Sequence, residues 1–407
     1  MAIPTPKVEI GFDLTDSPIG PFFRLDDSVA GVLDNADYRL GGTIFYDVTD
    51  RVRSINWNRG KSRRFSSFQA GSLGVEFNNH DRAFDPLYVD SPFYGNIIPR
   101  REIRVTSGNS IQFTGWIDDW GLTYTPNGES LADATASDAF TIIANQTISA
   151  GTPTQELTSE RINTVLDSVG VAWSNTLRNI ETGQVEVGTQ EITANTNALN
   201  YMQKVTETEG GLFFVGKNGA LTFKDSVDSP DSATLVTFDQ GSNIPYKSIG
   251  IVYGAELLYN EVTIANAGGG TAVAESVSSQ GEYGIRSLAL TDLLGATDEQ
   301  SVDLAVRYVD LYSQPEYRIE QLEVSLHDLN STDQETILGL ELGAVCKVVF
   351  TPNGIGDPIE KFIQVIRMNN SVKPTTHYAT FGFQEIKYLS LVLDDAVFGK
   401  LDAGTLG

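Results

Sequence analysis

Few residues in this chain of 407 are of the types that perform catalysis, and those few are dispersed. Its three histidines, His80, His327 and His377, are distant in the sequence, and none forms a His-x-x-x-His or Glu-x-x-His pair. Cys346, the only cysteine, lies in an alternating strand pattern, where an inert core thiol is the expected role. We therefore expect no catalytic residue, no cofactor and no metal site, and hence no enzyme.

Two short motifs resemble active-site elements. Asp118 and Asp119 could form the carboxylate pair of a glycosidase, but neighbouring acids are expected by chance in a chain with 53 of them. The segment ANAGGGTA, residues 265–272, lacks the Lys-Ser/Thr pair of a phosphate-binding loop. A hairpin tip is the better interpretation of this glycine run.

The chain is strongly acidic, with 53 Asp and Glu against 28 Lys and Arg and a formal net charge of -25. Binding to the phosphates of nucleic acid requires a basic surface, so sequence-specific nucleic-acid binding is disfavoured. The same repulsion would suit a wall along which DNA slides without adhering.

One segment departs from this acidity: residues 51–64, RVRSINWNRGKSRR, contain six basic residues. A solvated strand face is the simplest interpretation. A docking strip for an acidic neighbour is the second, because opposite charge orients partners and speeds association. A nucleic-acid patch is the third, although Trp57 and Phe65 are few for a stacking platform. The candidate docking residues are Arg51, Arg53, Arg59, Lys61, Arg63 and Arg64.

A decapeptide near the start of the chain returns near its end, as LDDSVAGVLD at residues 25–34 and LDDAVFGKLD at residues 393–402. Seven positions match, and the three that differ fall at every second residue, which is the period of a strand. We favour two docking segments whose acidic pairs meet a basic strip such as residues 51–64; two unrelated acidic turns are the alternative. The candidate docking residues are Leu25, Asp26, Asp27, Val29, Gly31, Leu33, Leu393, Asp394, Asp395, Val397, Gly399 and Leu401.

Size and composition predict an ordered protein of several domains. The chain is too long for one ordinary core, and 20 Phe with 15 Tyr supply ample apolar surface. A single cysteine excludes an intrachain disulfide. Prolines and acids interrupt the N-terminal MAIPTPKVEIGFDLTDSPIG before any apolar run forms. We therefore expect neither a signal peptide nor a membrane span, and a protein made and kept soluble in a cytoplasm.

Hydrophobic periodicity predicts a mainly β chain with α+β modules. Residues 1–150 and 236–388 alternate as strands, with a hairpin over residues 103–117, and residues 151–235 form a small α/β domain. An Asn218-Gly219 hairpin turn lies in that small domain. Residues 389–407 form a tail that carries the second decapeptide.

Apolar spacing predicts three helices, of which only the third falls within residues 236–388. The first has the stripe Ile162, Val165, Leu166 and Val169 and stops at Gly170. The second has the stripe Leu199, Met202 and Val205 and ends at Gly210. The third begins at a capping box formed by Thr297 and Gln300, has the stripe Val302, Ala305, Val306 and Val309, and ends before Pro315.

Several ordered motifs carry a resemblance to a known family. The segment GSLGVEFNNHDRAFDPLYVDSPFYGNIIPRREIRV, followed by QFTGWIDDW and ADATASDAF, resembles the opening domain of minor tail proteins of long-tailed actinobacteriophages, which are similar to baseplate hub proteins. Farther on, YNEVTIA, YGIRSLAL and QPEYRIEQLEV resemble the second half of the same family. The resemblance spans about residues 7 to 402 and its motifs are structural rather than chemical.

This resemblance implies a tail-hub fold, in which two tail-tube-like β-barrel or sandwich domains, 1–150 and 236–388, flank smaller α/β modules. It implies a homotrimeric ring at the distal tip of a non-contractile siphovirus tail, in the virion. The ring would join a tail tube or distal tail protein to fibre, receptor-binding or other minor tail proteins, contact the tape measure protein, and line the DNA exit channel. The alternatives are a sixfold distal tail protein, a carbohydrate- or receptor-binding module marked by Trp116 and Trp120, and a wall hydrolase.

Overall fold

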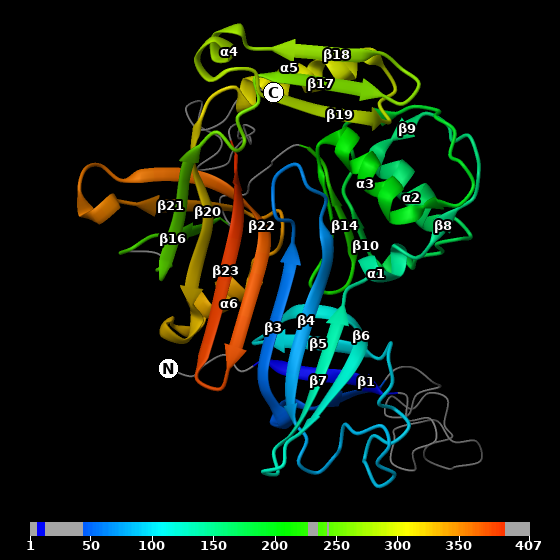
Figure 1. Cartoon of the computed structure of the whole chain (residues 1–407), viewed down its shortest axis with the longest axis vertical. Coiled ribbons are helices and arrows are strands. Elements are labelled where there is room, and N and C mark those ends of the chain that lie inside the picture. The colour runs from blue at the N-terminus through cyan, green and yellow to red at the C-terminus, as the bar shows by residue number, and fades with distance from the viewer. Residues whose placement is uncertain (1–5, 13–43, 227–234, 242–243, 387–407) are drawn as a thin grey trace.

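One large, mainly antiparallel sheet forms the body of the molecule (Figure 1). The computed structural model describes residues 6–12, 44–226, 235–241 and 244–386. Within these ranges thirteen strands join the large sheet, and β21 (Val345–Phe350) pairs both with β22 and with β15 (Val236–Phe238). The other strands, in spatial order, are β16 (Ser248–Gly254), β20 (Glu316–Ser325), β23 (Thr376–Glu385), β22 (Ile359–Lys373), β3 (Val52–Gly60), β4 (Gln69–Asn78), β7 (Ser130–Ser137), β6 (Ser110–Tyr124), β5 (Glu102–Ser107), β1 (Lys7–Phe12) and β2 (Ile44–Asp47).

Strands from the two ends of the chain meet near the middle of this sheet. β22 pairs antiparallel with β3, so that Asn369 lies opposite Asn58 and Val372 lies opposite Ile55. The hairpin predicted over residues 103–117 is confirmed, since β5 and β6 pair antiparallel. The large sheet runs through both strand-rich regions, and the division of the chain into domains stays a prediction.

One face of the large sheet, which we call the back face, is apolar. Ile55 and Trp57 of β3 and Leu73 and Val75 of β4 are buried there in a core that β1 and β5 to β7 complete. A second core lies against β20 to β23 and continues into the region of residues 139–226. The alternation of apolar and polar residues in these strands therefore places every second side chain in a core.

Residues 139–226 form a small α/β unit that shares this second core. Its helices α2 and α3 pack together, and β10, β14 and β13 form a three-stranded sheet. The elements are α1 (Phe140–Ile143), β8 (Thr147–Ile148), β9 (Glu156–Leu157), α2 (Thr158–Asp167), β10 (Arg178–Ile180), β11 (Glu186–Val187), β12 (Thr196–Asn197), α3 (Ala198–Glu209), β13 (Leu212–Val215) and β14 (Leu221–Lys224).

Two of the three predictions made for this unit are confirmed. α3 ends at Gly210, which adopts the left-handed conformation with φ 76°. β13 and β14 form the predicted hairpin, and Gly219 in its turn has φ 82°. The first predicted helix, however, extends too far. Ser168 leaves the helical conformation, so α2 stops at Asp167, and Val169 is 98% exposed instead of buried.

A third unit contains the sheet β18-β17-β19 with one long helix packed on it. The predicted capping box of Thr297 and Gln300 is present at the start of this helix, α5. Half of its predicted apolar stripe is wrong, because Val302 and Val306 are 49% and 46% exposed. Aromatic residues one turn further on take the buried positions instead. The elements are β17 (Glu261–Asn266), β18 (Thr271–Glu275), α4 (Val277–Tyr283), β19 (Ser287–Leu293) and α5 (Asp298–Tyr312).

The prediction of one helix within residues 236–388 is wrong. The described residues of this range contain α4, α5 and α6 (Ser331–Gly339). Neither α4 nor α6 has an apolar stripe: α4 buries only Ser279, and the buried residues of α6 are Gln334, Ile337 and Leu338. Short single-turn 3-10 helices lie at Thr49–Arg51, Asn175–Leu177, Leu326–Asp328 and Pro352–Gly354. No helix in the described ranges is long and apolar enough to span a membrane.

Candidate functional site: the open face of the large sheet

The structure brings together two of the histidines that are distant in the sequence. The His377 backbone N–H lies 3.3 Å from Nδ1 of His327, and Nε2 of His377 lies 3.1 Å from Oδ1 of Asn370. His80 is exposed in a turn. Cys346 is fully buried, and burial raises the pKa of its thiol to about 12. In the described part of the chain, no three His, Cys, Asp or Glu residues are grouped to hold a metal ion.

Neighbouring residues give structural roles to the two motifs that resemble active-site elements. Asp118 accepts a hydrogen bond from Ser137 at 2.5 Å and lies 3.6 Å from Arg100, whereas Asp119 is exposed on the opposite side of a bulge in β6. Residues 265–272 connect the antiparallel strands β17 and β18, which confirms the interpretation of this segment as a hairpin tip.

The tryptophans pack within the protein. Trp57 is 3% exposed in the core of the back face. Trp120 stacks on Phe84 with ring centroids 5.6 Å apart, and its indole N–H donates to the Ile98 carbonyl. Trp116 packs against the second core. Trp116 and Trp120 thus contribute much of their surface to packing rather than to an exposed aromatic platform.

The basic residues of segment 51–64 do not form one continuous strip. Arg51 pairs with Asp81 at 2.7 Å, and Arg53 pairs with Glu129 at 2.8 Å. Both pairs lie at the surface, where ion pairs contribute little to stability. The two decapeptides, residues 25–34 and 393–402, lie outside the described residues, so their docking role stays a prediction.

Two further members of the segment are buried. Arg59, which is 3% exposed, donates to the Val215 carbonyl and pairs with Glu341 at 2.8 Å. The ammonium group of Lys61 donates to the Arg64 carbonyl at 2.7 Å, and burial together with the nearby Arg64 charge lowers its pKa to about 7. These charges are thus used inside the chain.

Arg59 belongs to a buried charged junction between β3, the β13–β14 hairpin and the end of α6. The Lys217 ammonium group donates to the Leu338 carbonyl, and its backbone N–H donates to Glu341 at 2.9 Å. Burial lowers the pKa of Lys217 to about 8 against the pull of Glu341. Burial alone would raise the pKa of Glu341, but the charges of Arg59 and Lys217 hold it below its ordinary value.

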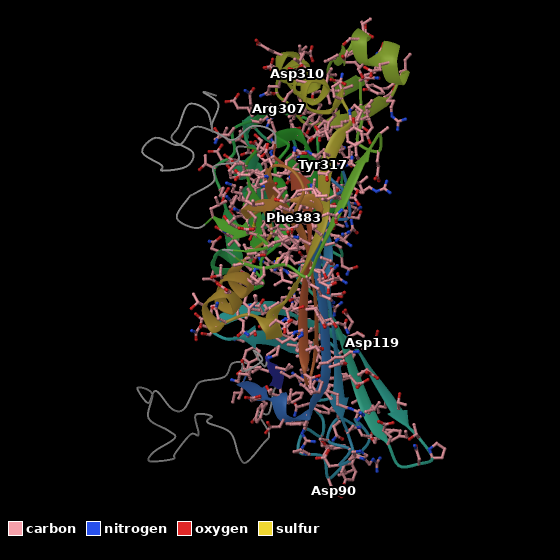
Figure 2. All side chains as sticks on the ribbon, turned by 90° about the vertical axis from the view of Figure 1, so that its left-hand side faces the viewer. Asp90, Asp119, Arg307, Asp310, Tyr317 and Phe383 are labelled. Atoms are coloured by element: carbon pink, nitrogen blue, oxygen red, sulfur yellow. The ribbon has the colours of Figure 1, made fainter. Side chains whose placement is uncertain are left out.

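The opposite face of the large sheet, which we call the open face, carries small polar side chains. Its register places Asn58 opposite Asn369 of β22 and Ser72 of β4. Figure 2 shows the sheet nearly edge-on, with Asp119 on the side that faces the reader in Figure 1. The open face consists of Gln321, Glu323, Thr380, Gly382, Arg367, Asn369, Ser371, Asn56, Asn58, Ser72, Gly74, Glu76, Asp133, Thr135, Asp119 and Gly121.

Two glycines let longer side chains lie flat on the open face. A Cβ atom at Gly74 would lie 3.0 Å from Oδ1 of Asn56 on the neighbouring strand. A Cβ atom at Gly382 would lie 2.9 Å from Nε of Arg367. Because glycine has no side chain, the amide and the guanidinium can extend across the sheet instead of projecting from it.

The open face carries charged side chains of both signs, and some of them are paired. Arg53 lies 3.7 Å from Glu76, and Lys247 at one edge lies 2.5 Å from Glu323. The remaining surface offers hydroxyl and amide groups, which bind water and do not attract a polyanion. Over β3, β4, β6 and β7 the open face is therefore polar and free of a basic cluster that would hold nucleic acid.

Comparison with known proteins reveals similarity of fold but not of sequence. No protein-family model and no curated protein matches the chain. The tail protein from Neisseria meningitidis MC58 is similar over 93% of this chain and 96% of its own, with a TM-score of 0.58 and 10% identity. The 43 kDa tail protein of prophage MuSo2 from Shewanella oneidensis is similar over 84% and 94%, with a TM-score of 0.54 and 14% identity.

These two tail proteins come from Neisseria meningitidis and from a Shewanella oneidensis prophage, so the narrower actinobacteriophage family suggested by the sequence motifs stays a prediction. The predicted fold class is confirmed, because both similar structures are tail proteins and both are covered almost completely. This mainly β chain with a large antiparallel sheet has the fold of phage tail proteins.

Proposed function

We propose that this chain is a structural protein of a phage tail and that its open face lines a channel for DNA. The observation that carries the proposal is the chemistry of that face. A basic wall would bind DNA phosphates through counterion release, and a broad apolar wall would be unstable in water. Small hydroxyl and amide groups avoid both effects. The fold similarity to two tail proteins supports the same role.

In its finer form, the proposal places the chain in a homotrimeric hub ring at the distal tip of the tail. The ring joins the tail tube or distal tail protein to fibre or other minor tail proteins, and it contacts the tape measure protein. Closed symmetry leaves no unsatisfied subunit edge, as expected for assemblies of identical chains. This role is structural, so zymography on host cell wall is expected to show no hydrolysis.

Electron cryomicroscopy of the virion tests the ring. The expected map has threefold density at the tail tip, with Asn58 and Thr135 facing the lumen. A sixfold ring would favour the distal tail protein instead. A map in which the open face is buried against another protein, or faces bulk solvent, would overturn the channel assignment.

A charge-insertion experiment tests the wall directly. Asn58→Lys and Thr135→Lys add positive charge to exposed positions of the open face. Thr336→Lys adds the same charge to an exposed position of α6 and serves as the matched control. If the face lines the channel, particles with the face variants assemble but eject DNA more slowly, and the control behaves as the parent. Equal ejection rates in all particles would contradict the proposal.

A further inference from the structure

The last two basic residues of segment 51–64 enter a groove at the end of the open face. Arg63 and Arg64 lie in the connection between β3 and β4, and they line this groove together with Arg318 of β20 and Arg367 of β22. The groove has a volume of about 340 Å³. Four guanidinium groups and the carboxylates of Glu256, Glu316, Glu320 and Glu385 therefore share one depression.

These arginines are held loosely by the carboxylates around them. Arg63 lies 3.3 Å from Glu256, and Arg318 lies 3.5 Å from Glu256. Charge-assisted hydrogen bonds from arginine usually measure about 2.7 to 2.9 Å. By comparison, the Arg51–Asp81 pair elsewhere in the chain measures 2.7 Å. The guanidinium groups of the groove thus retain donor capacity for a further acceptor.

Arg367 has the largest unused capacity. No hydrogen bond or ion pair joins its side chain to another residue within the described ranges, and its Nε atom is buried without a partner. It lies beside Gly382, where a Cβ atom would come within 2.9 Å of Nε. A planar guanidinium in this position matches the two oxygens of a carboxylate.

Apolar residues complete the lining of the groove. Leu257, Ile319 and Phe383 line it beside the arginines, and Figure 2 labels Phe383 near the middle of the molecule. Arg64 lies over the Tyr312 ring, 5.2 Å from its centroid, and donates to the Glu385 carbonyl at 3.2 Å. Ile319 and Phe383 are only 3% and 7% exposed, so the groove offers mainly its charged side chains and suits a peptide that carries an acidic pair.

The chain itself contains such a peptide close to the groove in sequence. Gln384 and Glu385 line the groove, and the described chain ends one residue later at Ile386. Eight residues then lead to Asp394, a distance of at most roughly 26 to 29 Å when extended. The segment LDDAVFGKLD, residues 393–402, carries an acidic pair followed by Val397 and Phe398.

We propose that the groove binds the chain's own 393–402 segment, with Asp394 and Asp395 accepting hydrogen bonds from the groove arginines. The proposal goes beyond the assembly role given above and does not depend on the ring. Of the basic segment 51–64, only Arg63 and Arg64 belong to this docking surface. Arg318 and Arg367, which are distant in the sequence, complete it. The acidic pair and the loosely held arginines have opposite charge, which makes the two surfaces complementary.

Peptide binding tests the proposal on the full-length chain. The receptor carries Asp394→Asn and Asp395→Asn, so that its own segment does not compete. The acidic probe is a fluorescent peptide of residues 389–404 with the parent sequence. The matched control, which we call the amide probe, is the same peptide with both of these Asp→Asn substitutions. Fluorescence anisotropy should show saturable binding of the acidic probe that weakens with salt, and binding at least about tenfold weaker for the amide probe.

Receptor variants locate the binding site. Arg367→Gln and Arg63→Gln should each weaken binding of the acidic probe by about tenfold, and Arg367→Lys should be intermediate because lysine keeps the charge but not the planar fork. Arg53→Gln is the matched control, since Arg53 is paired with Glu129 outside the groove, and it should bind as the parent does. Far-ultraviolet circular dichroism checks that each variant is folded, and Arg63 is safest in this respect because its side chain is 71% exposed.

Three outcomes would overturn the groove assignment: no binding, equal binding of both probes, or equal loss with Arg53→Gln and Arg367→Gln. Ring formation is measured separately by the symmetry of the tail tip. Failed peptide binding with an intact threefold ring would reject only the groove, whereas specific binding without a ring would reject only the proposed hub.

Discussion

β3 carries two arginines that the large sheet places in opposite surroundings. Arg53 lies at the surface of the open face near Glu76 and Glu129, with 44% of its side chain exposed. Arg59 lies on the back face at 3% exposure, between the Val215 carbonyl and Glu341. Arginine in this one strand is thus exposed to water on one face and bonded to other parts of the chain on the other face. The face, rather than the charge, determines the role.

Replacing these arginines should separate the two faces most clearly. Arg59→Met leaves Glu341 and the Val215 carbonyl without the guanidinium that binds both, and removal of one partner of a buried pair costs about 3 to 5 kcal/mol. The lower part of that range is expected, because the Glu341 side chain is 34% exposed. Urea unfolding of the full-length chain measures the free energy of unfolding.

Arg53→Met is the matched control, and it should leave the urea midpoint close to that of the parent because surface pairs contribute little. If both variants lost the same stability, the contrast between the faces would be wrong.

Titration of the buried residues Lys61 and Lys217 should have the next largest effect on the free energy of unfolding. The pKa of Lys217 is about 8 in the folded chain, below its ordinary value of 10.5, and that of Lys61 is about 7. At pH values between these lowered pKa values and the ordinary lysine pKa, the unfolded chain binds more protons than the folded chain. The free energy of unfolding therefore rises with pH in this range. We expect a rise of at least about 2 kcal/mol between pH 7.5 and 9.5.

Urea unfolding at several pH values measures this rise. Lys61→Met with Lys217→Met should flatten it, whereas Lys204→Met, which changes a partly exposed lysine of α3, should not. A rise of the same size in the double variant would show that other groups cause it.

Exchanges of small polar residues on the open face should have the smallest effect on stability. Asn58→Ser and Thr135→Ser remove no core contact, and exposed substitutions of this kind usually change stability by less than about 0.5 kcal/mol. Thermal unfolding of each variant measures the change. A loss above about 2 kcal/mol would mean that these side chains are buried or bonded in the native chain, contrary to an open face.

The alternation of apolar and polar residues in the sequence predicted the strands well, because every second side chain of these strands packs in a core. In RSINWN, Ile55 and Trp57 point to the back face and Asn56 and Asn58 to the open face. Alternation did not predict the opposite placement of Arg53 and Arg59, which have the same parity in the sequence. The register of β3 against β4 shifts between residues 52 and 54 and again between residues 58 and 60, and such bulges change the face to which a side chain points.

The open face and the groove could not be predicted from the sequence of any single segment, because both combine residues of several strands. The polar half of each strand is visible in the sequence, but the register that aligns Asn58 with Asn369 and Ser72 is a tertiary property. Likewise, Arg318 and Arg367 join Arg63 and Arg64 only after strands from both ends of the chain have paired. The buried role of Lys217 also depends on contacts with α6.

The pairing of β3 with β22 also sets the order of events during synthesis. Gly60 lies opposite Arg367, so the partner of β3 leaves the ribosome roughly 300 residues after β3 itself. At about 5 to 20 residues per second, this interval lasts roughly 15 to 60 seconds. Throughout that time the edge of β3 presents unpaired backbone groups, which can join a strand of another nascent chain. This edge of β3 can therefore be covered by its native partner only after residues 359–373, near the end of the chain, have been made.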